Sequence, residues 1–344
     1  MKKITSIFAL LLCVFVFSCS NDDDKETSSL QIVSSNVTFE SAGGTGTIKV
    51  NAISEITATS NKDWCTVSVN GDIINVSVIE NNDMSGRTAA VTITDGEAST
   101  LVPVSQGGCV ILYNKSESGH AFTYAGGSAT VSFSTTASYS IEVPAEAQSW
   151  LSYTLDEENR TITFNVAASA DKTPRGAAVK VTAGKKTIYY HLGEYELKDI
   201  AGKWRVSFVD GDDSTLAGEI EVVQDEEEPT IFYLSGISNF FDLPLIYNGE
   251  ALLTMGGLNL GTYAGRYNIY TVTLSEGGYV SWDMSTQYVA YPSSINGKFA
   301  LVFGDNGSWD GDVVNGIAYW AFSGAAGTGS AGWLEKFNAL TLSK

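Results

Sequence analysis

Two stretches of this sequence repeat one pattern of residues, and this duplication most constrains the fold. The offset between the stretches rises only from 83 residues at Phe39 to 88 residues at Arg87. The shared positions, in order, are Phe39, Ala42-Gly43-Gly44, Trp64, Arg87 and Gly96 in the first copy and Phe122, Ala125-Gly126-Gly127, Trp150, Arg175 and Gly184 in the second. Matching order, identity and spacing indicate two copies of one module.

Each copy reads as short strands separated by turns. Residues 47–50, 74–78 and 90–94 alternate apolar and polar side chains, which is the period of half-buried strands. Gly43-Gly44, Asn70-Gly71 and Asp95-Gly96 supply turns in which a positive φ is readily adopted. About seven short strands in such a length predict an immunoglobulin-like sandwich. We expect the first sandwich over residues 31–108 and the second over residues 109–196.

The first copy resembles a BACON domain, a Bacteroidetes module for which a carbohydrate-binding role has been proposed. The resemblance rests on the Ala-Gly-Gly turn, Asp63-Trp64, residues 87–93 and the closing Val102-Pro103-Val104-Ser105-Gln106. In the second copy, His191-Leu192-Gly193 stands where the first has Ser105-Gln106-Gly107, so this copy departs from the pattern. We expect Trp64 and Trp150 to fill the sandwich cores rather than bind sugar, because each lies in an alternating strand context. The two copies then serve as spacers or as binders.

The N-terminus predicts export and lipidation. Lys2 and Lys3 precede an apolar run from Ile7 to Phe17, and an eleven-residue helix rises only about 16 Å, roughly half a bilayer core. Residues 1–18 are therefore expected to be a signal peptide. Val16-Phe17-Ser18-Cys19 resembles a bacterial lipobox, which implies acylation of Cys19 and an outer-membrane anchor. The following acidic run resembles the surface-export signal of Bacteroidetes lipoproteins, and residues 19–30 form the tether.

Charge and cysteine content bear on the possible binding partners and on disulfide formation. The formal net charge of −19 makes nucleic acid an unfavourable partner, because an acidic chain repels phosphates. Cys65 and Cys109 remain after removal of the leader and lipidation. Their spacing leaves open whether they pair.

Residues 197–344 differ from the two copies. From residue 198 onward, 22 of 147 residues are aromatic, and 18 acidic residues stand against 7 basic ones. Nine or ten strand patterns with glycine-rich turns predict an antiparallel barrel or a strongly curved sandwich. The expected fold class is all-β: two immunoglobulin-like β-sandwiches followed by a larger antiparallel β-barrel or curved β-sandwich.

The opening of this domain resembles lipocalin-like barrels. Gly202-Lys203-Trp204 is similar to the Gly-x-Trp of the first lipocalin strand. The resemblance implies that Trp204 plugs the barrel floor, that an arginine of the last strand covers it, and that a cavity takes a small apolar ligand. No arginine occurs in residues 337–344, so this sequence departs from the pattern there.

The segment from Phe303 to Asp312 is the most ligand-like part of the chain. It places Trp309 beside three carboxylates, Asp305, Asp310 and Asp312. An aromatic face and carboxylate acceptors suit a pyranose, and oxygen ligands also suit Ca²⁺, although the spacing lacks an EF-hand pattern. A solvated Gly/Asp turn is the alternative. The further candidate ligand contacts are Trp282 and Tyr291.

These observations lead to three hypotheses for function. The leading one is a cell-surface lipoprotein that binds glycans, polysaccharide or mucin-type, without catalysis. The alternatives are a lipocalin-like carrier of a small apolar ligand and a structural or adhesion protein that binds another surface protein. Glycoside hydrolysis needs a distinct carboxylate pair, and no pair stands out, so an enzyme is not expected. Nothing in the sequence identifies a metal site or a cofactor.

Overall fold

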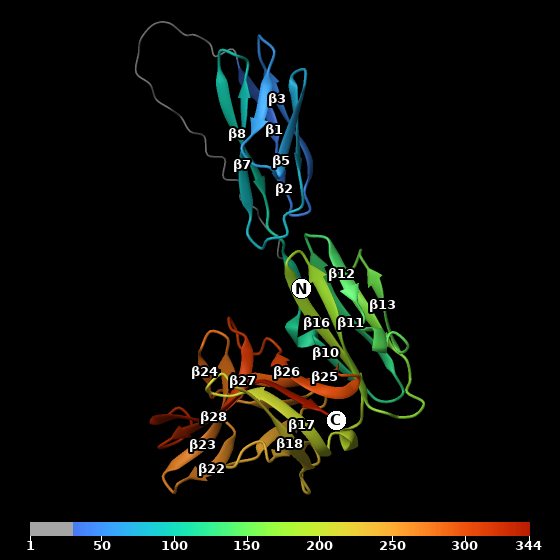
Figure 1. Cartoon of the computed structure of the whole chain (residues 1–344), viewed down its shortest axis with the longest axis vertical. Helices are drawn as coiled ribbons and strands as arrows, with labels where there is room; N and C mark the ends of the chain where they lie inside the picture. The colour runs from blue at the N-terminus through green and yellow to red at the C-terminus, as the bar shows by residue number, and fades with distance from the viewer. Residues whose placement is uncertain (1–29) are drawn as a thin grey trace, which may run out of the picture. The chain divides into compact units, whose positions relative to one another are not determined.

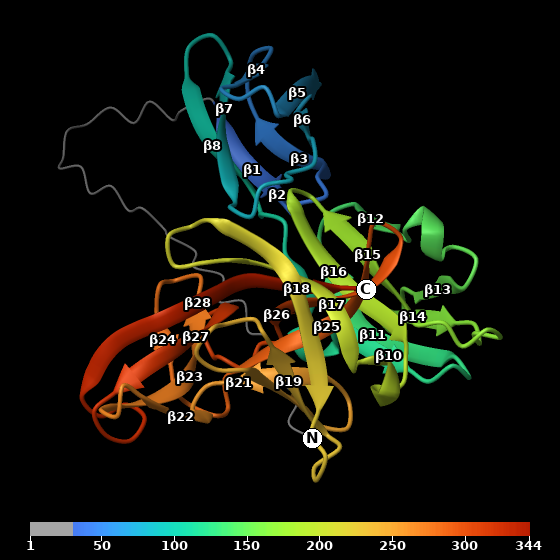
Figure 2. The same cartoon turned by 60° about the horizontal axis from the view of Figure 1, so that its bottom comes forward.

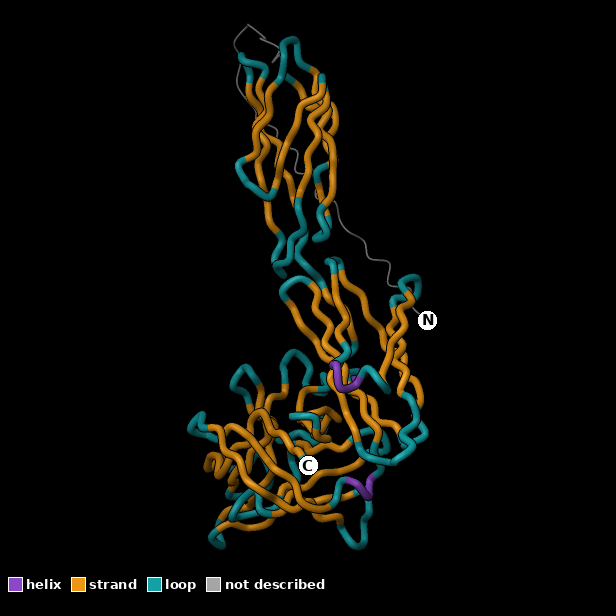
Figure 3. The backbone as a smooth tube through the Cα atoms, turned by 45° about the vertical axis from the view of Figure 1, so that its right-hand side comes forward, coloured by secondary structure: helices purple, strands orange, loops and turns teal. Residues whose placement is uncertain are grey.

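The computed structural model describes residues 30–344, and this part of the chain is all-β, which confirms the expected fold class. The strands form five sheets (Figure 1). The helices within residues 30–344 are three short 3₁₀ turns, drawn in purple where visible in Figure 3. These turns are η1 (Lys115–Glu117), η2 (Ala145–Ala147) and η3 (Leu197–Asp199).

The described residues divide into two compact units. One unit holds most of the first sandwich, namely residues 30–37, 45–76 and 89–103. The other holds residues 38–44, 77–88 and 104–344. The second sandwich and the C-terminal domain therefore belong to one unit.

The first sandwich consists of two four-stranded sheets, in the orders β1-β3-β6-β5 and β2-β8-β7-β4. Its strands are β1 (Gln31–Asn36), β2 (Thr38–Phe39), β3 (Gly44–Asn51), β4 (Thr57–Ser60), β5 (Cys65–Asn70), β6 (Ile73–Val78), β7 (Arg87–Thr94) and β8 (Ser99–Gln106). Alternate residues of β6 and β7 are buried, among them Ile74, Val76, Val91 and Ile93. The period-two pattern of the sequence thus builds the core.

The second sandwich repeats this arrangement, with sheet orders β10-β16-β15-β12 and β13-β14-β11-β9. Its strands are β9 (Ile111–Tyr113), β10 (Gly119–Phe122), β11 (Gly127–Thr135), β12 (Tyr139–Glu142), β13 (Leu151–Asp156), β14 (Thr161–Val166), β15 (Arg175–Ala183) and β16 (Lys186–Glu194). In both copies a short early strand pairs in parallel with the last strand, whereas the pairs β1–β3, β4–β7, β9–β11, β11–β14, β12–β15, β13–β14 and β15–β16 are antiparallel. The duplication seen in the sequence is therefore a duplication of topology.

An equivalent hydrogen bond in each copy shows which residues of the two closing strands correspond. Arg87 Nε donates to Gln106 Oε1 at 2.8 Å, and Arg175 Nε donates to Glu194 Oε2 at 2.5 Å. Phe39 lies opposite Gln106 as Phe122 lies opposite Glu194. Glu194 is therefore the counterpart of Gln106, which corrects by two residues the alignment expected for the end of the second copy.

The C-terminal domain is one twelve-stranded antiparallel sheet, and eight of its strands close into a barrel. Its strands are β17 (Gly202–Val209), β18 (Thr215–Gln224), β19 (Ile231–Ser235), β20 (Leu243–Tyr247), β21 (Leu252–Met255), β22 (Asn259–Tyr263), β23 (Tyr267–Ser275), β24 (Val280–Ser281), β25 (Gln287–Ile295), β26 (Lys298–Asp305), β27 (Val314–Phe322) and β28 (Ser330–Ser343). The ring runs β17-β18-β19-β20-β21-β25-β26-β28, and β28 pairs with β17 to close it. Of the two architectures expected, the structure therefore has the barrel.

The long strand β28 joins the barrel to a lateral extension made of β27, β23, β22 and β24 (Figure 2). Its last residues pair with β17 and β26, while residues 330–338 pair with β27. Ala339 lies between these two parts and has a φ of 49°. This left-handed conformation is uncommon for a non-glycine residue and marks the point at which the strand changes its pairing.

Aromatic and aliphatic side chains occupy the barrel interior. Trp204, Phe232, Tyr288 and Phe299 are buried there, and the rings of Trp204 and Phe299 lie 5.8 Å apart. Side chains of this size fill a barrel of eight strands, as expected from its diameter. The interior therefore does not support the hypothesis of a carrier for an apolar ligand.

Trp204 makes two contacts in the barrel, and one of them bears on the lipocalin resemblance. Its Nε1 donates to the carbonyl of Ile200 at 2.7 Å. The ammonium of Lys344 lies 5.0 Å from the centroid of the Trp204 ring. A lysine at the end of the last strand thus takes the place at which the resemblance implied an arginine.

Candidate functional site

The second sandwich packs directly on the barrel along β25. Three glycines of the sandwich make this approach possible, because a Cβ at Gly119, Gly176 or Gly193 would lie 2.2 to 2.5 Å from Tyr291, Ser293 or Pro292. All residues of β25 from Tyr288 to Ser293 are buried. A strand with one face in the barrel and the other under a sandwich loses the usual alternation.

Asp305 lies in this contact and binds the second sandwich. Its Oδ2 accepts a hydrogen bond from Lys115 Nζ at 2.7 Å, and the side chain is only 8% exposed. Burial lowers the pKa of Lys115, but the hydrogen bond and the charge of Asp305 outweigh it, so the net pKa is raised. The carboxylate expected to contact a ligand is therefore committed to an ion pair.

Tyr291 also belongs to the contact rather than to a free surface. Its ring stacks on His191 with centroids 5.1 Å apart, and its hydroxyl donates to the carbonyl of Asp305 at 3.0 Å. The residue is 7% exposed, and burial raises the pKa of its hydroxyl. Burial lowers the pKa of the neighbouring His191 to about 4, because it disfavours the charged imidazolium. The structure thus assigns Tyr291 to positioning the two domains.

Trp309, Asp310 and Asp312 line a shallow hollow of about 360 Å³ beside Lys115. Trp309 is partly buried against the barrel core, while Asp310 is exposed. Asp312 Oδ1 accepts from the Val313 amide at 2.9 Å, and this hydrogen bond is the largest cause of its lowered pKa. An ionised acceptor and an aromatic side chain therefore adjoin one another, as the sequence predicted for this loop.

A larger groove of about 510 Å³ adjoins this hollow and shares Lys115 and Val313 with it. The second sandwich contributes Tyr113, Lys186 and Tyr189, and the C-terminal domain contributes Glu276 together with the predicted residues Asp305 and Tyr291. Tyr189 is 48% exposed, so its ring is open to a ligand. We call the groove and the hollow together the junction groove. It combines aromatic faces, cations and carboxylates from two domains, which is the mixture that binds polar ligands with apolar faces.

The other predicted residues lie outside the junction groove. Trp282 is 46% exposed and packs edge-to-face on Phe322, with ring centroids 6.1 Å apart. Trp150 is buried in the second sandwich, and the guanidinium of Arg175 lies 4.6 Å from its ring centroid. Trp64, which we expected in the core of the first sandwich, is only partly buried.

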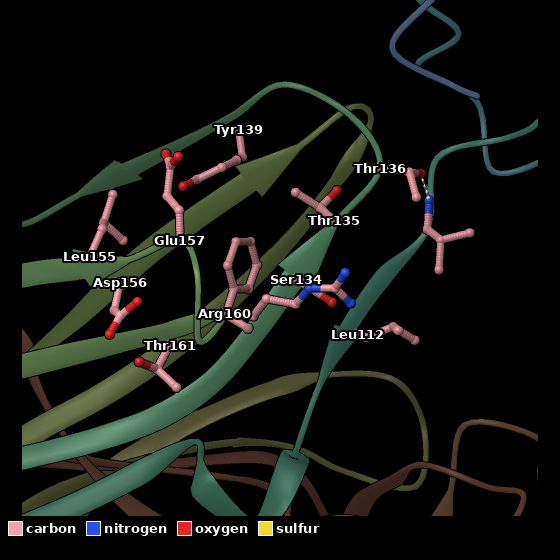
Figure 4. Close-up of a pocket in the computed structure, with 12 residues that line it drawn as sticks. Leu112, Ser134, Thr135, Thr136, Tyr139, Leu155, Asp156, Glu157, Arg160 and Thr161 are labelled. Atoms are coloured by element: carbon pink, nitrogen blue, oxygen red, sulfur yellow. Dashed lines mark hydrogen bonds between the residues drawn. The ribbon is translucent and has the colours of Figure 1, made fainter. Parts of the chain in front are cut away.

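A second cleft lies at one end of the second sandwich (Figure 4). It measures about 400 Å³ and exposes the apolar side chains of Leu112 and Leu155. Phe133 forms part of its lining and contacts the Tyr139 ring edge-to-face at 5.2 Å. Asp156 accepts from Asn159 within its own turn, at 2.9 and 2.7 Å. Because the Asp156 carboxylate is already bonded to Asn159, this cleft suits a polar ligand less well than the junction groove does.

Two further expectations concern metals and the membrane. Within residues 30–344, no group of three or more His, Cys, Asp or Glu side chains could hold a metal ion, so we propose no Ca²⁺ site. Cys19, the expected lipidation site, lies outside the described residues. In the described part of the chain, no helix is long and apolar enough to cross a bilayer. Cys65 and Cys109 are both buried and unpaired.

Sequence reasoning did not identify the sandwich side of the junction groove. Tyr113, Lys115 and Tyr189 precede Trp309 by more than a hundred residues, and no motif marks them. One signal was present in the sequence: the second copy departs from the family pattern at residues 191–193. His191 and Gly193 prove to be residues that contact β25.

Comparison with known proteins identifies the class of the two sandwiches. Residues 54–107 and 137–189 match the sequence profile of the BACON family, described as "Putative binding domain, N-terminal". The chain therefore contains two BACON domains, which confirms the expected resemblance for both copies. These matches do not extend to the C-terminal domain.

Among individual proteins, a xyloglucan-specific endo-beta-1,4-glucanase of Bacteroides ovatus is 28% identical over 107 residues. The match covers 29% of this chain and 21% of the glucanase, so it spans about a fifth of that enzyme. A solved Bacteroides ovatus GH5 xyloglucanase in complex with a heptasaccharide is 26% identical over 23% of this chain and 19% of that chain, with a TM-score of 0.22. A titin I9–I11 tandem is 7% identical over 80% of this chain and 94% of that chain, with a TM-score of 0.32.

Proposed function

We propose that this chain is a lipid-anchored surface protein that binds glycans at the junction groove without cleaving them. The observation that carries the proposal is that Tyr189 of the second sandwich lines the groove and Trp309 of the C-terminal domain lines the adjoining hollow, with Lys115 lining both. Aromatic faces pack on the C–H face of a pyranose, and carboxylates accept its hydroxyl protons. The BACON domains and the likeness to part of a xyloglucanase support a role in carbohydrate use.

The chemistry of the groove favours binding over hydrolysis. A glycosidase needs one protonated carboxyl group with a raised pKa opposite an ionised one. Here Asp305 is paired with Lys115, and the hydrogen bond from Val313 lowers the pKa of Asp312. Neither of these two carboxyl groups suits the role of the general acid, which supports the proposal of a non-catalytic site.

The test is binding of the full-length protein to a panel of plant and mucin-type glycans. Tyr189→Ala and Trp309→Ala should each weaken binding about tenfold, as loss of a central aromatic contact typically does. Trp282→Ala is the matched control, because Trp282 is an exposed tryptophan of the same domain outside the groove. Failure of every glycan to bind the folded protein would overturn the proposal.

Export and anchoring need a separate experiment. We propose that Cys19 carries lipid in the outer membrane and that the following acidic residues direct the protein to the surface. Cys19→Ala should abolish labelling by a radioactive fatty acid and release the protein from the membrane fraction. Unchanged labelling of this variant would contradict the assignment. A pull-down from envelope extracts that recovers one surface protein, with no glycan bound, would support the adhesion alternative instead.

A further inference from the structure

A third hollow, of about 310 Å³, lies on the C-terminal domain and shares no lining residue with the junction groove. It forms where the turn between β17 and β18, the loop between β19 and β20, and β28 come together. Trp333, Glu335 and Lys336 line it from β28, and Ser238 and Asn239 line it from the loop. No motif in the sequence marked this combination.

Trp333 presents an aromatic surface that is held in place. Its side chain is 45% exposed. The Gly211 backbone lies against the ring, since a Cβ at this position would be 2.4 Å from Trp333 Cη2. The ammonium of Lys336 is 4.7 Å from the ring centroid. A ring fixed by these neighbours loses little conformational freedom when a ligand packs on it.

Glu335 supplies an acceptor that lacks a donor. Its Oε2 is buried and has no hydrogen-bond partner among residues 30–344. Burial raises the pKa of this carboxyl group, and a hydrogen bond from Ser238 partly opposes the increase. Glu335 also lines the hollow, so its carboxyl group is an acceptor for a ligand hydroxyl there, and such a hydrogen bond would offset the cost of its burial.

The charges around the hollow select against anions. Asp210, Asp212 and Glu335 line it, against the single cation Lys336. Asp210 Oδ1 already accepts from the amides of Asp212 and Ser214 at 2.9 Å, so its role is to hold the turn. Sulfated sugars and uronic acids would meet these carboxylates at close range and be repelled.

We infer that this hollow binds a neutral pyranose unit of a glycan, with its C–H face on Trp333 and a hydroxyl group donating to the carboxyl group of Glu335. The site is separate from the junction groove and uses other residues. It gives the C-terminal domain its own contact with a polysaccharide chain. Two such contacts on one protein would raise the overall affinity for a long glycan beyond that of either site.

The test follows the indole N–H signal of Trp333 in ¹⁵N spectra of the full-length protein, assigned with Trp333→Phe. The probes are cellotetraose, xylotetraose and mannotetraose at millimolar concentration, with tetragalacturonate as the anionic control. At least one neutral tetrasaccharide should shift this signal, and tetragalacturonate should not. Tyr189→Ala, which alters the junction groove, should leave the shift unchanged. No shift with any neutral probe, or an equal shift with tetragalacturonate, would overturn the inference.

Glu335→Leu separates a binding role from a structural one. This substitution removes the cost of the unpartnered oxygen together with the hydrogen bond from Ser238, and because these two effects oppose each other the thermal stability should change little. The same variant should weaken binding of the active tetrasaccharide about tenfold. Unchanged affinity, or a loss of stability that accounts for the weaker binding, would contradict the assigned role. Because this readout is independent of the junction groove, its failure leaves the proposed function standing.

Discussion

Replacing Lys115 with Met, Asp305 with Asn, and then both residues measures how strongly the second sandwich and the barrel are coupled. The Nζ–Oδ2 distance is 2.7 Å, and the side chains are 36% and 8% exposed. Solvent at Lys115 screens the pair, so we expect a coupling free energy of about 1–2 kcal/mol, above that of an exposed pair and below that of a fully buried one. Lys115→Met should be the more harmful single change, because it leaves the buried carboxylate without its cation.

The assay is urea denaturation of the full-length protein, followed by tryptophan fluorescence and circular dichroism. Changes in midpoint at constant slope give the free energies, and the double-mutant cycle gives the coupling. Lys180 and Glu142 serve as the control pair, since they lie 3.4 Å apart and are 46% and 70% exposed. A coupling between Lys115 and Asp305 no larger than that of the control pair would refute the reasoning.

Three other predictions test separate contacts. Gly193→Ala places a methyl group 2.4 Å from a carbon of β25 and should destabilise the protein by about 1–3 kcal/mol in thermal melts. Gly218→Ala is the control and should not destabilise it, because a Cβ there meets nothing within 4 Å. Equal effects of the two substitutions would contradict this prediction. In the folded protein the pKa of His191 is lowered from the usual 6.5 to about 4. The free energy of unfolding is therefore greatest above pH 6.5 and decreases as the pH falls from 6.5 to 4, because only the unfolded state gains the proton in this range. His191→Phe should remove about 3 kcal/mol of this pH dependence, and an unchanged slope would count against it. Lys344→Met should cost about 1 kcal/mol, because it removes the cation over Trp204 and the hydrogen bond from the ammonium to the Asp199 carbonyl, and an unchanged melting temperature would contradict this.

Local patterns predicted the duplication and most of the strands, although nine or ten strands were expected in the C-terminal domain, which has twelve. Strand residues such as Ile74 and Val76 alternate with polar neighbours, and burial follows the same period in the structure. Glycine-rich turns predicted a barrel or a strongly curved sandwich, and the lipocalin resemblance implied a buried Trp204, which lies in the barrel core. These features depend on neighbours in the chain, which a sequence displays directly.

Side chains at the contact between domains could not be predicted in the same way. Asp305 and Tyr291 are residue types that often contact ligands. In the structure, however, Asp305 bonds to Lys115 and Tyr291 stacks on His191, both from the second sandwich. The composition of residues 303–312 shows which groups are available but not which are already bonded. Trp309, Asp310 and Asp312 kept their predicted surroundings because no other segment covers their loop completely.

The departure of the second copy from the BACON pattern has a structural reason. Glu194 pairs with Arg175 where Gln106 bonds Arg87, so the hydrogen bond survives although the residue changes. Gly193, just before it, lies against Pro292 at a distance that no larger side chain permits. The second module is therefore altered where it contacts the barrel.

A crystal structure of the full-length protein with the oligosaccharide that binds best in the panel tests the account most directly. We predict sugar units in the junction groove, one in contact with Tyr189 and one in contact with Trp309, and a hydroxyl group within hydrogen-bond distance of Asp310 or Asp312. A sugar bound elsewhere, with the junction groove free of ligand at saturating concentration, would contradict the central claim.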